Sequence, residues 1–215
     1  VLSLNSLNEH LYSSPSQPKV IPYVTSYYNK TWGFCISHEQ RLNPKDGNYE
    51  VFIDSKFENG FLEYGEYFIP GQSKMEILLS TYICHPSMAN NELSGPIVLA
   101  EFLRNILSQN SEVLRKYSIR IVFLPETIGS ITYIKNNLNH LRNNVIAGYV
   151  ITCVGDERNW SFLPSKYGNT LSDRVMLRSF ANLGINFNTY SWLERGSDER
   201  QYCSPGVDLP IASFM

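Results

Sequence analysis

Residues 77–95 read ILLSTYICHPSMANNELSG, and this stretch decides the fold. An apolar run from Ile77 to Ile83 stops abruptly and polar residues follow. Two later runs, Ile119 to Leu124 and Val145 to Val154, stop in the same way. Short apolar runs bounded by polar residues are typical of strands buried on both faces of a parallel sheet. The sequence therefore predicts three such strands.

A titratable side chain follows each of the three runs. These residues are His85, Glu126 and Asp156. In open α/β sheets, ligands bind at the carboxyl ends of the strands. If the three runs are neighbouring parallel strands, the three side chains meet at that edge. The pattern indicates an active site there, with a metal as one interpretation.

The segments between these runs have helical periodicity. We expect helices at about residues 94–107, 129–142 and 170–183, because apolar residues recur there every three or four positions. Strands that alternate with helices favour an α/β fold with a mostly parallel sheet covered on both faces. This α/β domain is expected to span residues 72–215.

Residues 1–71 have a different composition, rich in β-branched and aromatic residues. We expect a β-rich first part with antiparallel strands, separated by the turn signals Asp46-Gly47 and Asn59-Gly60. The expected strands span residues 20–28, 32–37, 49–53 and 61–69. The change of pattern falls at Pro70-Gly71, which sets the predicted domain boundary.

The bulk composition narrows the class of protein. A chain of 215 residues fits one domain, or one domain with a subdomain. The net charge of −2 gives no indication of a nucleic-acid partner, and no apolar run reaches the length that spans a membrane. The chain starts at Val1 and stops at Met215 directly after an apolar run, so we expect the natural protein to continue.

The cysteines indicate a cellular location. Cys35, Cys84, Cys153 and Cys203 are widely spaced and form no CxxC pair. We expect free thiols in a reducing, cytoplasmic compartment. Cys84 and Cys153 lie in or at the end of predicted core strands, so they are expected to be buried.

Each candidate site residue has a functional and a structural interpretation. His85 suits a zinc ligand, although lone histidines are often structural. Glu126 follows a buried strand, where partial desolvation raises the pKa of a carboxyl group and suits a general base. It could also cap the next helix. Asp156 is either a metal ligand or a turn-stabilising residue.

Residues 195–201 (RGSDERQ) are dense in charge and lie between two short extended runs. One interpretation is a solvated loop. The other is a substrate-facing loop in which Arg195 and Arg200 bind a carboxylate or phosphate and Asp198 orients the substrate. Both interpretations remain open at this point.

Three stretches resemble the aminopeptidase-like superfamily: residues 82–87 (YICHPS), 125–130 (PETIGS) and 197–203 (SDERQYC). The resemblance covers most of the chain from about Ile21. It is strongest to a bacterial branch that is named for polysaccharide biosynthesis and carries an aminopeptidase-like domain. The fold implied is a phosphorylase/hydrolase-like three-layer α/β sandwich.

Zinc aminopeptidases of this superfamily bind two zinc ions, and the resemblance places their residues on this chain one at a time. The first histidine ligand falls on His85 and the catalytic base on Glu126. The bridging aspartate falls on Asn91 and the metal-binding glutamate on Thr127, so two of the expected carboxylates are missing. Within this resemblance, Glu126 and Asn91 occupy the catalytic positions.

The later aspartate of the superfamily falls near Thr152, with Asp156 close enough to replace it, and the final histidine has no match. Two zinc ions about 3.5–4 Å apart need bridging negative charge, which the neutral Asn91 does not supply. We therefore expect one zinc ion, with His85 and Asp156 as ligands, or no metal.

Three functions compete. The first is metal-dependent hydrolysis of an amide or peptide bond in a small peptide or aminoacyl substrate. The second is a non-catalytic binding module on a peptidase-like scaffold, and the third is an accessory role in polysaccharide biosynthesis. Whether the chain is an enzyme stays open. Further copies of the chain (a homo-oligomer) are among the expected partners, whereas nucleic acid and membrane are not.

Overall fold

The computed structural model describes residues 1–24, 29–56, 58–85, 88–108 and 115–215. The chain divides into two compact units, Val1–Asn59 and Gly60–Met215, and each is considered by itself. No helix in the described part of the chain combines the length and the apolar character needed to cross a membrane.

The first unit has little regular structure. It contains the strands β1 (Leu2–Ser3), β2 (Leu11–Tyr12), β3 (Phe34–Cys35) and β4 (Asn48–Tyr49) and the helices α1 (Leu4–Asn8) and α2 (His38–Leu42). β1 pairs antiparallel with β4, but β2 pairs parallel with β3.

The prediction of antiparallel strands in this unit is thus confirmed only in part: among the described residues, the strands expected at 32–37 and 49–53 are reduced to two residues each, and one of the two pairings is parallel. Residues 25–28 of the first expected strand lie outside the described residues, and residues 20–24 before them form no strand. Val20, Ile21 and Val24 are exposed, because this small unit buries little apolar surface. A β-branched run without a layer to cover it has no packing energy to hold it in a sheet.

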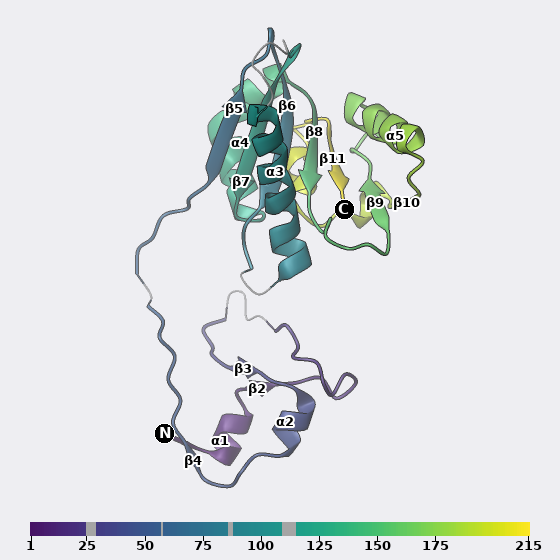
Figure 1. Cartoon of the computed structure of the whole chain (residues 1–215). Helices are drawn as coiled ribbons and strands as arrows, with labels where there is room; N and C mark the ends of the chain where they lie inside the picture. The colour runs from purple at the N-terminus through teal and green to yellow at the C-terminus, as the bar shows by residue number, and fades with distance from the viewer. Residues whose placement is uncertain (25–28, 57, 86–87, 109–114) are drawn as a thin grey trace. The chain divides into compact units, whose positions relative to one another are not determined.

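The second unit is built on one seven-stranded sheet, ordered β10-β9-β11-β8-β6-β7-β5 (Figure 1). Its strands are β5 (Gly65–Ile69), β6 (Ser73–Tyr82), β7 (Tyr117–Leu124), β8 (Val145–Ile151), β9 (Trp160–Leu163), β10 (Phe187–Thr189) and β11 (Ile211–Phe214). β6 pairs parallel with β7 and β8, whereas β5 pairs antiparallel with β7. The predicted mostly parallel sheet is confirmed.

Helices cover both faces of this sheet. They are α3 (Ser94–Ser108), α4 (Ile128–Asn144), α5 (Leu171–Leu183) and the short α6 (Asp198–Tyr202). In β6, Leu78 packs with side chains of α4 and α6, and the next residue, Leu79, packs with Leu99 of α3. Successive strand residues point to opposite faces, so α3 and α4 lie on opposite sides of the sheet (Figure 1).

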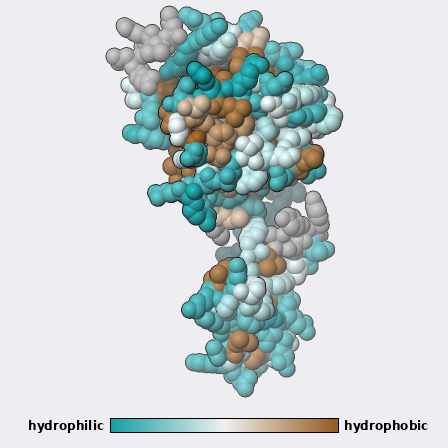
Figure 2. All heavy atoms as spheres, turned by 90° about the vertical axis from the view of Figure 1, so that its right-hand side faces the viewer, coloured by the Kyte–Doolittle hydropathy of each residue, from teal (hydrophilic) through white to brown (hydrophobic). Residues whose placement is uncertain are grey.

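The helix α5 lies on the same face as α3. Its Phe180 packs against Phe162 and Ala212, and Tyr149 of β8 contacts both this group and the group around Leu79. Helices on both faces of one sheet confirm the predicted three-layer sandwich. Figure 2 views the side on which α5 lies in Figure 1 and shows hydrophobic residues gathered in a patch that hydrophilic residues surround.

The start of α3 lies directly on the carboxyl ends of two strands. A Cβ atom on Gly95 would lie 2.3 Å from the Ile151 carbonyl oxygen and 2.3 Å from Thr81 Oγ1. Only glycine permits so close an approach. Since β6 and β8 are the strands that α3 contacts here, the packing fixes the segment before α3 at the predicted site edge.

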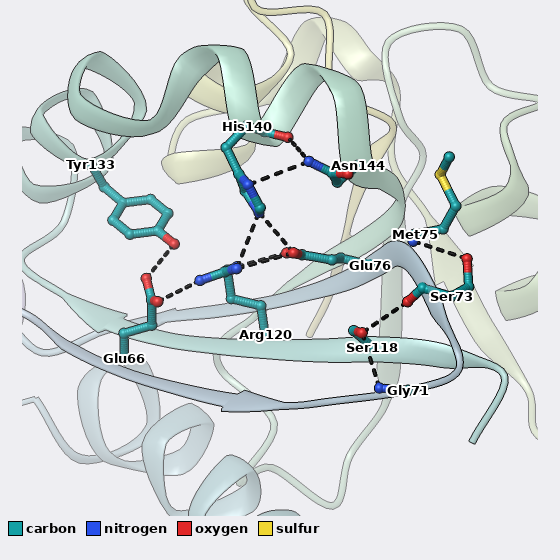
Figure 3. A network of polar contacts seen from close by, with 10 residues as sticks. All are labelled: Glu66, Gly71, Ser73, Met75, Glu76, Ser118, Arg120, Tyr133, His140 and Asn144. Carbon is teal, nitrogen blue, oxygen red and sulfur yellow. Dashed lines mark hydrogen bonds and ion pairs between the residues drawn. The ribbon is translucent and has the colours of Figure 1, made fainter. Parts of the chain in front are cut away.

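A buried ionic network lies near the opposite ends of these strands (Figure 3). Glu76 of β6 is 2% exposed and accepts hydrogen bonds from Arg120 of β7, at 2.6 Å and 3.0 Å, and one of 2.7 Å from His140 of α4. Arg120 also pairs with Glu66 of β5, which accepts a hydrogen bond from Tyr133. The network joins three strands and one helix.

The strand β5 belongs to this sheet, although the sequence places it in the β-rich first part. It forms five residue pairs with β7, from Gly65↔Phe123 to Ile69↔Ile119. The contacts divide the chain at Asn59 and Gly60, whereas the predicted domain boundary lies at residues 71/72. That boundary stays a prediction.

Candidate functional site

The carboxyl ends of β6, β7 and β8 meet at one edge of the sheet, as the sequence predicts. Tyr82, the last residue of β6, is in register with Leu124, the last residue of β7. Cys84 and His85 follow β6, and Glu126 follows β7. The hydrogen bond from the Ile83 N–H group to the Leu124 carbonyl (2.9 Å) continues this pairing beyond β6.

A cluster of potential metal ligands results from this alignment. Cys84 Sγ, a ring nitrogen of His85 and a carboxylate oxygen of Glu126 all lie within 4.8 Å of one another. Cys84 is exposed, and His85 and Glu126 are half-buried. Sulfur, imidazole nitrogen and carboxylate oxygen are all zinc ligands, so the residues present fit a zinc ion.

The loop that carries Glu126 is held from a second segment. Ser197 Oγ donates a hydrogen bond of 2.7 Å to Glu126 Oε1. The next residue, Thr127, has φ of 62° and precedes the first turn of α4. A positive φ is costly for a β-branched residue, so contacts with the 197–198 segment must hold this conformation.

Asp198 supplies one of these contacts from the interior. It is 0% exposed, and its Oδ1 accepts hydrogen bonds of 2.8 Å from the Thr127 N–H group and from Ser130 Oγ. Its Oδ2 has no hydrogen-bond partner among the described residues. Burial, with smaller effects from the charges of Glu126 and Glu199, raises the pKa of Asp198 to about 7.

Glu92 is a second buried carboxylate, and it holds the main chain at Cys84 as Asp198 holds it at Thr127. It lies in a π-helical turn, Ala89–Leu93, and is 2% exposed. Its Oε2 accepts a hydrogen bond of 2.7 Å from the Cys84 N–H group, while its Oε1 has no partner in the described part of the chain. π-Helical turns are frequent at functional sites, and this one brings a buried carboxylate next to the cluster.

The expectation that Cys84 is a buried structural thiol is wrong. Cys84 is exposed, because the chain leaves the sheet after Tyr82 and the apolar run of the sequence continues past the strand. Partial burial of the sulfur, together with the charges of Glu92, Glu126 and Asp198, raises the pKa of Cys84. A thiol kept protonated in this way is a poor nucleophile.

Asn91 lies at the same edge with its amide group engaged. Its Nδ2 donates a hydrogen bond of 3.2 Å to the Tyr82 hydroxyl and lies 3.5 Å from Cys153 Sγ, and the main-chain carbonyl oxygen of Asn91 accepts one from Thr152 Oγ1. These contacts tie the π-helical turn to the ends of β6 and β8. A catalytic role for Asn91 stays a prediction.

Asp156 is not part of the cluster found among the described residues. It forms an ion pair with Arg158, whose Nε lies 2.9 Å from both carboxylate oxygens, and it also accepts a hydrogen bond from the Arg158 N–H group. Hydrogen bonds from Arg158 lower the pKa of Asp156 to about 2. The structure therefore shows the turn-stabilising interpretation, and metal binding by Asp156 stays a prediction.

The two arginines of the 195–201 segment differ in their surroundings. The Arg195 guanidinium lies 4.8 Å from the centroid of the Trp192 ring and donates a hydrogen bond of 3.1 Å to the Trp192 carbonyl. Arg200 is exposed on α6. Asp198, from the same segment, is buried against the start of α4. Substrate binding by these three residues stays a prediction.

Sequence reasoning missed Cys84, Glu92 and Ser197 as members of this site. One signal was present for the first two: Cys84 directly precedes His85, and Glu92 lies two residues before the N-terminus of the predicted helix. Ser197 directly precedes Asp198 in a stretch already singled out. No local pattern shows that it reaches Glu126, because 71 residues separate them.

The chain matches one protein-family model, described as a domain of unknown function (DUF4910), over residues 13–215. The chain belongs to this family. A relative from Clostridium acetobutylicum is 42% identical over 214 residues, and its name assigns it provisionally to polysaccharide biosynthesis, with an aminopeptidase-like domain. The match covers 100% of this chain and 48% of the relative, so the chain spans about half the relative's length.

Solved structures confirm the fold of the family. A crystal structure from Clostridium acetobutylicum, provisionally named a peptidase, has a TM-score of 0.91 at 41% identity over 100% of this chain and 50% of its own. A zinc aminopeptidase from Bacillus subtilis has a TM-score of 0.56 at 16% identity, covering 71% of this chain and 39% of its own.

A glutaminyl cyclase from Porphyromonas gingivalis is about as similar, with a TM-score of 0.54 at 16% identity over 71% of this chain and 62% of its own. At this identity the likeness shows the fold alone. The two names describe different reactions on one scaffold, so the activity of this chain must be argued from its own site.

Proposed function

We propose that this chain carries the metal-binding part of a hydrolase that cleaves amide or peptide bonds. The observation that carries the proposal is the approach of His85 and Glu126 at the ends of two adjacent parallel strands, within 4.8 Å of one another. The aminopeptidase-like domain named in the Clostridium relative supports it. The expected substrate is a small peptide or an aminoacyl group.

Zinc is the proposed metal, and one ion rather than two. The imidazole of His85 suits zinc, and the neutral Asn91, whose amide donates to Tyr82, brings no bridging charge for a second ion. Because the chain spans about half the length of its relative, the remaining ligands are proposed to come from the rest of the protein.

The residues of the cluster have different roles in the proposed reaction. Zinc, when bound, lowers the pKa of water and polarises a carbonyl group. His85 would hold the ion through one ring nitrogen. Glu126, fixed by Ser197, accepts the proton of the attacking water and returns it to the leaving nitrogen. The cytoplasmic location expected from the free thiols remains part of the proposal.

A second candidate is a binding module that has lost catalysis. Two observations favour it: neutral residues, Asn91 and Thr127, occupy positions where the resemblance places carboxylates, and Asp156 pairs with Arg158. A ligand bound at the same edge, without hydrolysis, fits these observations. Metal content and the effect of Glu126 on turnover separate the two candidates.

The experiment measures bound zinc in the purified full-length protein and hydrolysis of a panel of aminopeptidase substrates. We expect Glu126→Gln to retain zinc and to lower kcat by about 10²–10⁴-fold, because it removes only the base. His85→Ala should lose both zinc and activity. His38→Ala is the matched control, since His38 lies in the first unit and bonds to Ser13.

Zinc retained in His85→Ala contradicts the assignment of the ligand. Two results together would support the binding module instead: the wild type binds no zinc, and the Glu126→Gln variant has the same activity as the wild type.

A further inference from the structure

We infer that Cys84 binds the metal through its sulfur, next to His85, so that the site contains a thiolate. The inference rests on the proposed metal site and goes beyond it. The pattern that the resemblance implies uses histidine, aspartate and glutamate ligands only. Cys84 would add the negative charge that Asn91 does not supply.

The first support is the position of the sulfur. Cys84 Sγ lies within 4.8 Å of both the His85 ring nitrogen and the Glu126 carboxylate. Zinc bonds of about 2.0–2.3 Å keep two ligand atoms of one ion no more than about 4.4 Å apart. A small side-chain rotation brings atoms at these distances within reach of one ion. Cys84 is exposed, so its side chain is free to rotate.

The second support is the fixed main chain on either side of the sulfur. The Ile83 N–H group donates to the Leu124 carbonyl at 2.9 Å, and the Cys84 N–H group donates to Glu92 Oε2 at 2.7 Å. Metal ligands are commonly held in place by such outer hydrogen bonds. With the main chain fixed, only rotation of the short Cys84 side chain places the sulfur.

The third support is the incompletely hydrogen-bonded side chain of Glu92. This carboxylate is 2% exposed, and its Oε1 has no hydrogen-bond partner among the described residues. The ion pairs that the described part of the chain forms do not include Glu92. A buried and incompletely bonded carboxylate is costly. A cation bound beside Cys84 would supply a favourable interaction for this oxygen, whereas a purely structural role for Glu92 leaves the unbonded oxygen unexplained.

A thiolate ligand sets the kind of metal that binds. Sulfur favours zinc and cadmium over magnesium, calcium and manganese, which prefer oxygen ligands. Cadmium is therefore a suitable probe, because its bond to a thiolate gives a charge-transfer band in the ultraviolet that imidazole and carboxylate ligands do not give.

The test titrates the metal-free, full-length protein with cadmium ions alone and measures zinc affinity by competition. We expect the charge-transfer band to saturate at about one equivalent, as for a single site. Cys84→Ser should remove the band and weaken zinc binding at least about tenfold, or about 1.4 kcal/mol. Cys35→Ser, in β3 of the first unit, is the matched control and should retain both.

Two further measurements make each outcome decisive. His85→Ala should also weaken cadmium binding at least about tenfold, whereas unchanged affinity indicates a lone thiol and overturns the inference. Thermal unfolding of metal-free Cys84→Ser verifies that the variant is folded.

Zinc binding by the wild type without the band, or a band that survives in Cys84→Ser, overturns the inference but leaves the proposed hydrolase. A wild type that binds neither ion removes both proposals.

Discussion

Burial of Asp198 makes the stability of the protein depend on pH. The pKa of Asp198 is about 7 in the folded protein, against an ordinary value of 3.8. The folded protein thus holds this proton more tightly than the unfolded chain does. The resulting stabilisation is fully present below about pH 4 and is lost as the pH rises through about 7.

We expect Asp198→Asn to remove this pH dependence. The asparagine oxygen can still accept from Thr127 and Ser130, but the side chain no longer ionises. The free energy of unfolding of the metal-free wild type should fall by up to about 4 kcal/mol between pH 4 and pH 8, through this group. Urea unfolding across that range measures it, and the Asp198→Asn curve should be flatter by this amount.

Asp208→Asn is the control for this measurement. Lys166 lowers the pKa of Asp208 through a hydrogen bond of 2.7 Å, so this group titrates below the range studied. Equal slopes for the wild type and Asp198→Asn would show that Asp198 ionises normally.

Residues at strand ends were predictable, and their partners were not. His85 and Glu126 follow apolar runs, and the sheet edge brought them together as expected. Cys84 was misread because an apolar run does not show where a strand leaves the sheet. The ion pair of Asp156 depends on Arg158, two residues away, so the sequence contained that signal. Long-range partners such as Ser197 depend on the tertiary fold.

At the scale of elements, the network around Glu76 joins β5, β6, β7 and α4 (Figure 3). Burial alone would raise the pKa of Glu76, but hydrogen bonds from Arg120 and His140 lower it overall. The carboxylate is therefore charged and depends on its partners. Removing one partner of a buried ion pair leaves an uncompensated charge.

We expect Arg120→Met to lower the free energy of unfolding by about 3–5 kcal/mol at neutral pH. Arg104→Met is the matched control. Arg104 pairs with Glu101, but the two side chains are 74% and 49% exposed, so its loss should cost less than about 1 kcal/mol. Urea unfolding of both variants measures the difference, and comparable losses would show that burial does not set the strength of the Arg120 pair.

Helices, central strands and the two short extended runs that flank residues 195–201 (β10 and β11) were predicted within a few residues, but β9 was not. The periodic apolar residues of α3, α4 and α5 and the buried runs of β6, β7 and β8 identify them locally. β9 has four residues and pairs antiparallel with β11 through Leu163 with Ser213 and Phe162 with Phe214, residues at least fifty positions apart. Residues 20–24 and 50–53 of the expected strands form no strand, because a β-branched composition needs a covering layer, which this unit does not provide.

At the scale of the whole molecule, the position of β5 decides between a domain boundary at residues 59/60 and one at residues 71/72. The contacts place β5 with the sheet, in a unit from Gly60 to Met215, whereas composition places it with the first part. β5 covers one edge of β7 and carries Glu66 of the ionic network. A sheet without β5 exposes the β7 edge and loses that ion pair.

We therefore expect residues 60–215 produced alone to unfold cooperatively, with a midpoint within a few degrees of the corresponding transition in the full chain. Residues 72–215, cut at the boundary predicted from composition, should unfold at a clearly lower temperature or aggregate, because β5 is missing and the edge of β7 that it covers is exposed. Calorimetry and size-exclusion chromatography compare the two fragments with the full chain. Equal stability of the fragments would favour the boundary at residue 71, and failure of both to fold would show that the first unit is needed.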